Sequence, residues 1–222
     1  MLGIIFVVAI VILIVMIIIA LLFERIQIHL EKYHTHNKVY KVLKSFADEN
    51  DHYLLNDVEL YMDSRNAEPT VFDHILFADK YIYVISDLTA FGGIYGNAKD
   101  ATLFLKNEKG EIKNINNPLL TCERKVRLLE AAIGANSSKH LIIGVTVYNN
   151  SLIVPKNIKV KNQDNCFLPV KELYETLEEA EKDDVTSFED RKTKELVDMI
   201  KKRSDAVKED VRRNKTKLRK RK

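Results

Sequence analysis

The sequence has no tryptophan, only two cysteines and few glycines or prolines among its 222 residues. Cys122 and Cys166 form no Cys-x-x-Cys pair, which argues against a zinc site and fits a reducing compartment. Gly92, Gly93 and Gly96 do not form a Gly-x-Gly-x-x-Gly loop, so we interpret them as a turn rather than as a nucleotide-binding element. Nine phenylalanines and nine tyrosines are available for a core, and the length suits one domain with appendages.

Acidic residues are absent from the C-terminal end after position 210. The chain has a formal net charge of +3, but residues 211–222 carry eight basic residues, so the rest of the chain has a net charge of −5. Such a tail can bind nucleic acid phosphates, lie on an anionic lipid leaflet, or simply remain solvated. No aromatic residue lies among these basic residues, so the tail does not predict stacking on nucleic acid bases. The candidate binding residues are Arg212, Arg213, Lys215, Lys217, Arg219, Lys220, Arg221 and Lys222.

One long hydrophobic run occupies residues 1–23 and contains no charged residue and no proline. About 20 apolar residues suffice to cross a bilayer as a helix. A cleaved signal peptide would begin with basic residues and have a shorter apolar stretch. We therefore predict an uncleaved transmembrane helix. Arg25, Lys32 and Lys38 follow the run and nothing basic precedes it, so the positive-inside rule predicts an outside N-terminus and a cytoplasmic remainder.

The remainder of the chain predicts an α/β domain with a mixed sheet. Val39, Val42, Leu43 and Phe46 form an apolar stripe on a juxtamembrane helix over residues 24–46. Short strand-like runs bounded by turn signals follow, at residues 52–62, 71–77, 81–86, 101–106 and 111–115.

A second helix is marked at both ends, by Asn117 as the N-cap with Pro118 next to it, and by Gly134 at the C-terminus. The apolar run at 140–148 is typical of a central strand buried on both faces. We further expect a short strand at 157–161 and a helix at 169–180. Residues 181–222 are a charged helical extension whose thin apolar seam predicts weak packing on the domain, with self-association through this seam as the alternative.

Residues 36–180 resemble the NERD (nuclease-related) domain family, which is placed with the PD-(D/E)xK nuclease-like folds. Five features carry the resemblance, in order: a helix followed by YLLNDVEL at 53–60, Phe-Asp-His-Ile at 72–75, YVI at 83–85 before a glycine-rich exit, Asn-Pro-Leu at 117–119, and a hydrophobic strand with a final helix. The resemblance implies a centre in which two carboxylates hold Mg²⁺ and a lysine assists the attacking water.

The residues expected for that centre are mostly replaced. The family's Glu-x-Lys positions fall on Ser86 and Leu88, and the acid of its first helix falls near His36–Asn37. The glutamine often found in the Asn-Pro helix falls on Thr121. Only Asp73 matches, as a leftover metal ligand or as a structural carboxylate paired with a backbone amide or with Lys80.

Asp87 is a possible substitute for the lost glutamate. Side chains alternate along a strand, which puts Ser86 on the face of Ile82 and Val84, and Asp87 on the opposite face with Tyr83. A centre built on Asp73 and Asp87 would therefore require a bulge.

The histidines do not predict a metal site by spacing alone. His34 and His36 lie two residues apart, so they would not face each other on a helix, and we assign them to a solvated segment near the membrane. His74 points away from Asp73 on the predicted strand, and we interpret it as a core or helix-facing histidine.

We therefore expect a membrane-anchored NERD-like domain with a degenerate catalytic centre, acting as a binding or scaffold module with nucleic acid as the candidate ligand. The first alternative is a metal-dependent nuclease with a rearranged centre on Asp73 and Asp87, requiring Mg²⁺ or Mn²⁺. The second is a membrane-surface structural protein. The main hypothesis requires no cofactor. It leaves the protein partner and the oligomeric state open.

Overall fold

The computed structural model describes residues 10, 12–17, 19, 35–61, 68–107, 109–134, 142–158 and 165–219, with side chains given up to position 213. The predicted membrane anchor, residues 1–23, falls largely outside these residues. Its described positions are helical and exposed. Among the described residues, no helix is both long and apolar enough to span a bilayer. His34 and residues 159–161 of an expected strand also lie outside the described residues.

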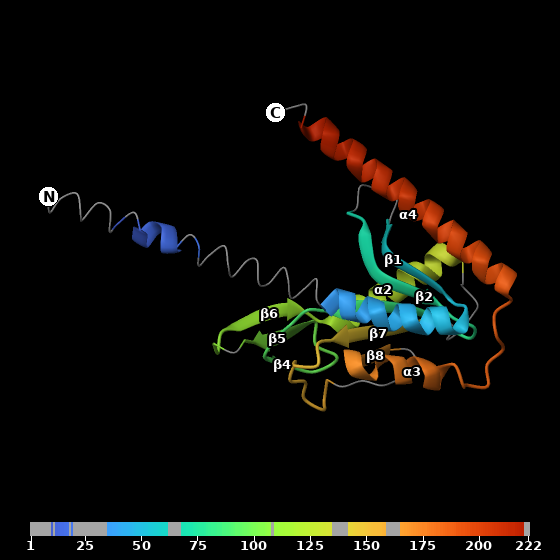
Figure 1. The fold of residues 1–222 in the computed structure, drawn as a ribbon, viewed down its shortest axis with the longest axis horizontal. Coiled ribbons are helices and arrows are strands. Elements are labelled where there is room, and N and C mark those ends of the chain that lie inside the picture. Colours follow the sequence, from blue (N-terminus) through green and yellow to red (C-terminus); the bar gives the residue numbers. More distant parts are fainter. Residues whose placement is uncertain are drawn as a thin grey trace.

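A mixed five-stranded sheet organises the domain, in the order β1–β2–β3–β7–β8 (Figure 1). Strands β1, β2 and β3 pair antiparallel, whereas β3, β7 and β8 pair parallel. The predicted α/β class with a mixed sheet is confirmed. The strands are β1 Tyr53–Leu60, β2 Thr70–Phe77, β3 Ile82–Leu88, β7 Ile142–Tyr148 and β8 Asn165–Pro169. Every residue of β7 is buried, as expected for a central strand.

A small antiparallel sheet joins β4 Gly93–Tyr95, β5 Thr102–Lys106 and β6 Ile112–Asn116. The β5–β6 hairpin is the predicted one, but β4 lies where the sequence indicated only a turn. Gly92 permits its entry: it has φ 86°, and an added Cβ would lie 2.1 Å from the carbonyl oxygen of Lys106. Only glycine fits there.

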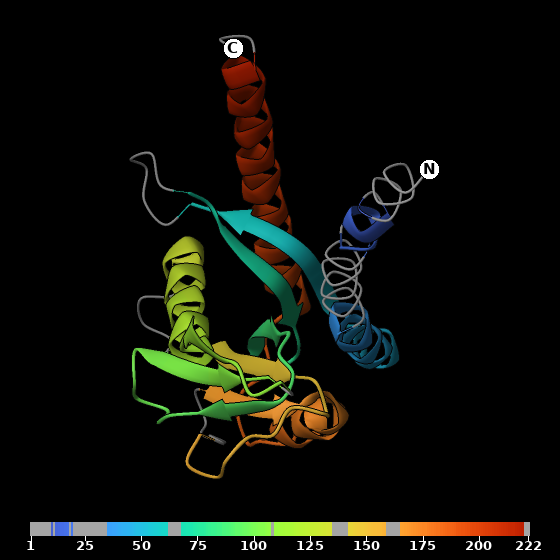
Figure 2. The same cartoon turned by 90° about the vertical axis from the view of Figure 1, so that its left-hand side faces the viewer.

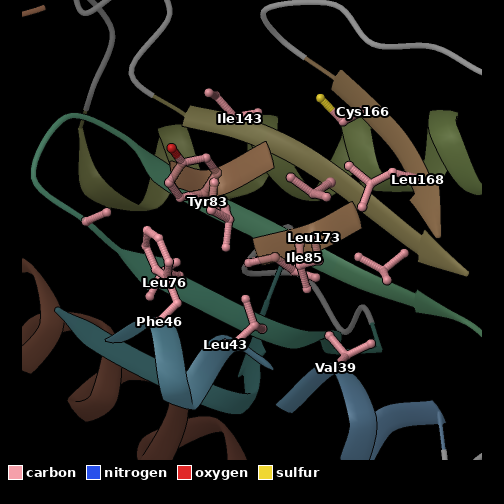
Figure 3. Packing of buried hydrophobic residues seen from close by; sticks show 14 of the residues in the cluster. Val39, Leu43, Phe46, Leu76, Tyr83, Ile85, Ile143, Cys166, Leu168 and Leu173 are labelled. Carbon is pink, nitrogen blue, oxygen red and sulfur yellow. The ribbon is translucent and has the colours of Figure 1, made fainter. Parts of the chain in front are cut away.

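Helices cover both faces of the large sheet. The helix over residues 35–50 and α3 Leu173–Ala180 pack on one face, and α2 Pro118–Ile133 and α4 Asp190–Arg219 pack on the other. Figure 3 shows Val39, Leu43 and Phe46 of the first helix facing Leu76 and Tyr83 of the sheet. The predicted stripe is confirmed, and its helix continues to position 50. Residues 24–34 of the predicted helix lie outside the described residues.

The predicted start and end of α2 are confirmed. The Asn117 side chain accepts a hydrogen bond from the backbone N–H of Leu119, at 3.0 Å. Its amide nitrogen donates to the carbonyl oxygens of Ala98 and Asp100, at 2.9 and 2.7 Å, and so ties the small sheet to the helix. Gly134 ends the helix in the left-handed conformation with φ 73°.

Helix α4 packs more closely than its charged sequence predicts. Figure 2 shows it alongside the curved β1–β2 hairpin, and Val197 and Ile200 are buried in the same cluster as strand residues. The hydroxyl of Ser204 accepts a hydrogen bond from the backbone N–H of Glu59, at 3.0 Å. Because β1 is an edge strand, this bond satisfies a donor that the sheet leaves unpaired.

One expectation after β7 is wrong, and one strand was not expected. Residues 156–158 form a turn rather than the start of a strand, with Ile158 N–H donating to the Pro155 carbonyl. The sequence does not predict β8, because its short apolar run continues directly into the helix expected from Pro169 and no turn signal separates the two. That helix begins as a 3₁₀ turn over Val170–Glu172, followed by α3.

Replacing Asn117 by alanine removes the α2 cap and leaves two carbonyl oxygens without their donor. We expect Asn117→Ala to lower the free energy of unfolding by about 2 kcal/mol in urea denaturation. Asn116 is its matched control because it is an exposed neighbour of the same type. Asn116→Ala should change stability by no more than about 0.5 kcal/mol. Equal effects of the two substitutions would contradict the role assigned to the cap.

Candidate functional site

Polar side chains from the middle of β2 and the last residues of β3 contribute to two clusters on opposite faces of the large sheet. Strand β3 keeps a regular register with β7 from Ile82 to Leu88, so its side chains alternate to the end of the strand. Ser86 consequently faces α2, whereas Asp87 faces the helix over residues 35–50. The bulge that would bring Asp87 to the face of Ser86 is not formed.

The first cluster consists of Asp73, Ser86 and Lys125 and is named the lysine cluster. The ammonium nitrogen of Lys125 lies 3.0 Å from Oδ2 of Asp73 and 3.0 Å from Oγ of Ser86. The lysine side chain is 11% exposed and the aspartate side chain 30% exposed. The same Asp73 oxygen accepts a hydrogen bond from the backbone N–H of Asp87, at 3.3 Å. Asp73 is thus a paired carboxylate at the border of the core.

Helix α2 supplies this lysine from its inward face. Cys122 and Val126 on the same face are buried against the sheet, and the Cys122 thiol donates to the Val84 carbonyl at 3.5 Å. Burial raises the pKa of the Cys122 thiol to about 11. The thiol therefore stays protonated at neutral pH and is not an activated nucleophile.

The expectation that Lys80 pairs with Asp73 is wrong. Lys80 donates from its ammonium to the Asp183 carbonyl and from its backbone N–H to Glu181, at 2.9 Å for the latter. Glu181 also accepts from the hydroxyl of Tyr83, at 2.7 Å, and burial raises the pKa of that hydroxyl. Lys80 therefore fastens the turn after α3 to the β2–β3 hairpin. The other expected partner of Asp73, a backbone amide, is present: the N–H of Asp87 donates to the Asp73 carboxylate.

The alternation of side chains along β2 is interrupted beside Asp73. Strict alternation would place Val71 on the same face as Ile75, but Val71 is 44% exposed and Phe72 is buried with Ile75. Across the hairpin, Asp57 has φ 50°, a left-handed conformation that aspartate tolerates better than most residues. The local irregularity in both strands lets the hairpin curve over α4.

The second cluster consists of His36, Asn56, His74 and Asp87 and is named the histidine cluster. Oδ2 of Asp87 lies 2.7 Å from Nδ1 of His36 and 3.1 Å from Nε2 of His74. The two imidazole rings stack with centroids 4.5 Å apart. On the other side of His74, Nδ1 lies 2.6 Å from Oδ1 of Asn56.

Asp73 and Asp87 therefore do not converge. Their carboxylates belong to different clusters, separated by the sheet itself. This geometry does not favour a metal ion bridging the two, as the rearranged nuclease centre requires. Within the part of the chain that the structure describes, three potential metal-ligand side chains of the His, Cys, Asp and Glu types come together only at His36, His74 and Asp87.

The described part of the basic tail lies at the far end of α4. Arg212 and Arg213 are exposed there, and Arg213 pairs with Glu209 one turn earlier. The helix continues to Arg219, while the side chains from position 214 and all of residues 220–222 lie outside the described residues.

A family model described as the nuclease-related domain, NERD, matches residues 32–149. The chain belongs to the NERD family. The matched range contains every residue of the lysine cluster and of the histidine cluster. No curated protein and no solved structure matches the chain.

Sequence reasoning missed Lys125 and the histidine cluster, although both had a signal. His36 precedes Val39 and Leu43 by three and seven residues, which places it on the buried stripe of its helix. Lys125 follows Cys122 by three residues on the apolar face of α2. In both cases a polar residue at a core-facing position indicated a buried partner.

The Asp73–Lys125 pair should show measurable energetic coupling because the lysine is largely buried. In a double-mutant cycle of Asp73→Asn and Lys125→Met, we expect a coupling free energy of about 1–2 kcal/mol from urea unfolding. The exposed Lys44–Asp48 pair provides the control and should show much weaker coupling. Additive effects of the two substitutions would mean that the pair contributes no specific stabilisation.

Proposed function

We propose that this NERD protein is a membrane-anchored, cytoplasmic module that binds nucleic acid without cleaving it. The proposal combines three features: the lysine cluster in place of a two-carboxylate centre, the basic end of α4, and the apolar N-terminal run. The lysine cluster carries the argument against catalysis.

The ammonium of Lys125 lies against Asp73 and Ser86, at the point where the family pattern calls for a second carboxylate. A single carboxylate paired with an ammonium has little attraction left for Mg²⁺, a hard cation that prefers several oxygen ligands. Leu88, at the family's lysine position, contributes its side chain to a hydrophobic cluster beside the small sheet. These replacements support binding in the absence of phosphodiester hydrolysis.

The basic residues from Arg212 to Lys222 supply the proposed nucleic acid contact. Phosphate neutralisation by lysine and arginine releases counterions and makes binding strongly dependent on salt. The apolar run at residues 1–23 supplies the proposed anchor, and the basic residues after it favour a cytoplasmic domain. Anionic lipid is the competing ligand for the same charges.

Binding and cleavage can be measured on the same samples of the full chain in mild detergent. Labelled single- and double-stranded DNA and RNA are incubated with Mg²⁺, Mn²⁺ or EDTA. We expect binding in all three conditions and intact nucleic acid throughout, because neither cluster presents a pair of carboxylates to a metal ion. Metal-dependent cleavage that disappears in Asp73→Asn, with the fold retained, would make the protein a nuclease and refute the proposal.

Removal of residues 212–222 tests the basic tail. We expect affinity to fall and the slope of log affinity against log salt to become shallower, by about 0.7–0.9 for each lost phosphate contact. Lys201→Gln/Lys202→Gln is the control, since it removes two exposed basic residues elsewhere on α4. Retention of affinity after truncation would exclude the tail as the binding surface. Binding only to vesicles containing phosphatidylserine would assign the tail to lipid.

A further inference from the structure

The histidine cluster has the composition and spacing of a transition-metal site. Nδ1 of His36, Nε2 of His74 and a carboxylate oxygen of Asp87 all lie within 4.8 Å of one another. They come from three separate elements: the helix over residues 35–50, β2 and β3. Two imidazoles and one carboxylate are a common ligand set for Zn²⁺ and other borderline divalent ions.

The hydrogen bonds of His74 leave one contact that a cation would explain. A neutral imidazole has one N–H group, yet both nitrogens of His74 lie against oxygen atoms, Oδ1 of Asn56 and Oδ2 of Asp87. The Nδ1–H group donates to Asn56, and Nε2 lies 3.1 Å from Oδ2 of Asp87. Both Nε2 and this carboxylate oxygen are atoms that can coordinate one metal ion.

Asp87 provides a second, independent indication. Its side chain is 6% exposed, and its Oδ1 atom is buried without a hydrogen-bond partner in the described structure. An unpaired carboxylate oxygen in the interior is costly, since neither water nor a donor compensates its lost hydration. A metal ion bound to the carboxylate would compensate that charge directly.

Access and orientation also fit a bound ion. His74 is fully buried, whereas the side chain of His36 is 28% exposed, so the cluster opens to solvent on the His36 side. Asn56 accepts from the second nitrogen of His74 in the manner of an outer-shell residue that fixes a metal-bound imidazole. A tetrahedral zinc centre requires ligand atoms about 3.3 Å apart, so the 2.7 and 3.1 Å separations to Asp87 must widen slightly.

We propose that His36, His74 and Asp87 bind one divalent transition-metal ion of the zinc class, with a water molecule as the fourth ligand. The ion joins the first helix of the domain to β2 and β3. The site lies on the opposite face of the sheet from the lysine cluster and is independent of nucleic acid binding. Its nitrogen ligands select against Mg²⁺, which prefers oxygen.

The full chain in detergent, first stripped with EDTA, tests the site with Zn²⁺, Co²⁺ and Mg²⁺ as probes. Zn²⁺ should raise Tm increasingly with its free concentration and bind in a one-to-one ratio, whereas Mg²⁺ should not raise Tm. Co²⁺ should give the intense visible absorption of a four-coordinate ion with nitrogen and oxygen ligands. His36→Gln removes one metal ligand and should weaken Zn²⁺ binding more than 100-fold, because changes to outer-shell residues alone lower metal affinity about 10- to 100-fold.

Asp87→Asn and His52→Gln complete the design. Asp87→Asn keeps the side-chain shape and should lose binding as His36→Gln does. His52 lies 3.7 Å from Asp79 and belongs to no metal-ligand cluster among the described residues, so His52→Gln removes an imidazole but should leave binding unchanged. Asn56→Ala should weaken binding about 10- to 100-fold through the orientation of His74.

Two results would overturn the assignment. Absence of any Zn²⁺-dependent change in Tm or of the Co²⁺ spectrum would show that the histidine cluster holds no metal ion. Equal Zn²⁺ binding in the original chain and in His36→Gln would place the ion elsewhere. His36 is partly exposed, so its variant should fold even if Asp87→Asn does not.

Discussion

The alternation of side chains along β3 is the constraint on which both polar clusters depend. This strand is hydrogen-bonded on both sides and covered by helices on both faces, so each residue must suit the layer that it faces. Ile82 and Val84 pack toward α2, while Tyr83 and Ile85 pack toward the opposite helices. Near the end of the strand, the same alternation places the side chains of Ser86 and Asp87 in separate layers.

Each layer then compensates its buried polar group differently. Under α2, an ammonium from the helix pairs with a carboxylate from β2, and the pair is close to neutral. Under the helix over residues 35–50, one carboxylate meets two imidazoles, and one of its oxygens has no hydrogen-bond partner among the described residues. A divalent cation would be repelled by Lys125 in the first cluster, but in the second it meets a carboxylate and two nitrogen lone pairs. This difference in local charge is why the metal proposal rests on the histidines.

The fold was largely predictable because its strongest signals are local. Asn117, Pro118 and Gly134 delimit α2 through backbone hydrogen bonding and conformational preference, which neighbouring residues decide. The apolar run of β7 likewise predicts burial on both faces. Strand β8 and the packing of α4 were harder, since a short apolar run or a thin seam becomes informative only when its partner is known. The seam of α4 is buried because β1 presents a matching apolar face and an unpaired N–H at Glu59.

The sequence by itself determined the family and the order of the main elements. It also determined that Asp87 faces away from Ser86, because strand alternation is a property of the backbone. Tertiary structure alone decided the partners of these residues. Lys125 lies 52 positions from Asp73, and His36 lies 51 from Asp87. Contacts at such separations depend on how helices cross the sheet, and the spacing of residues within a single helix or strand does not specify that crossing.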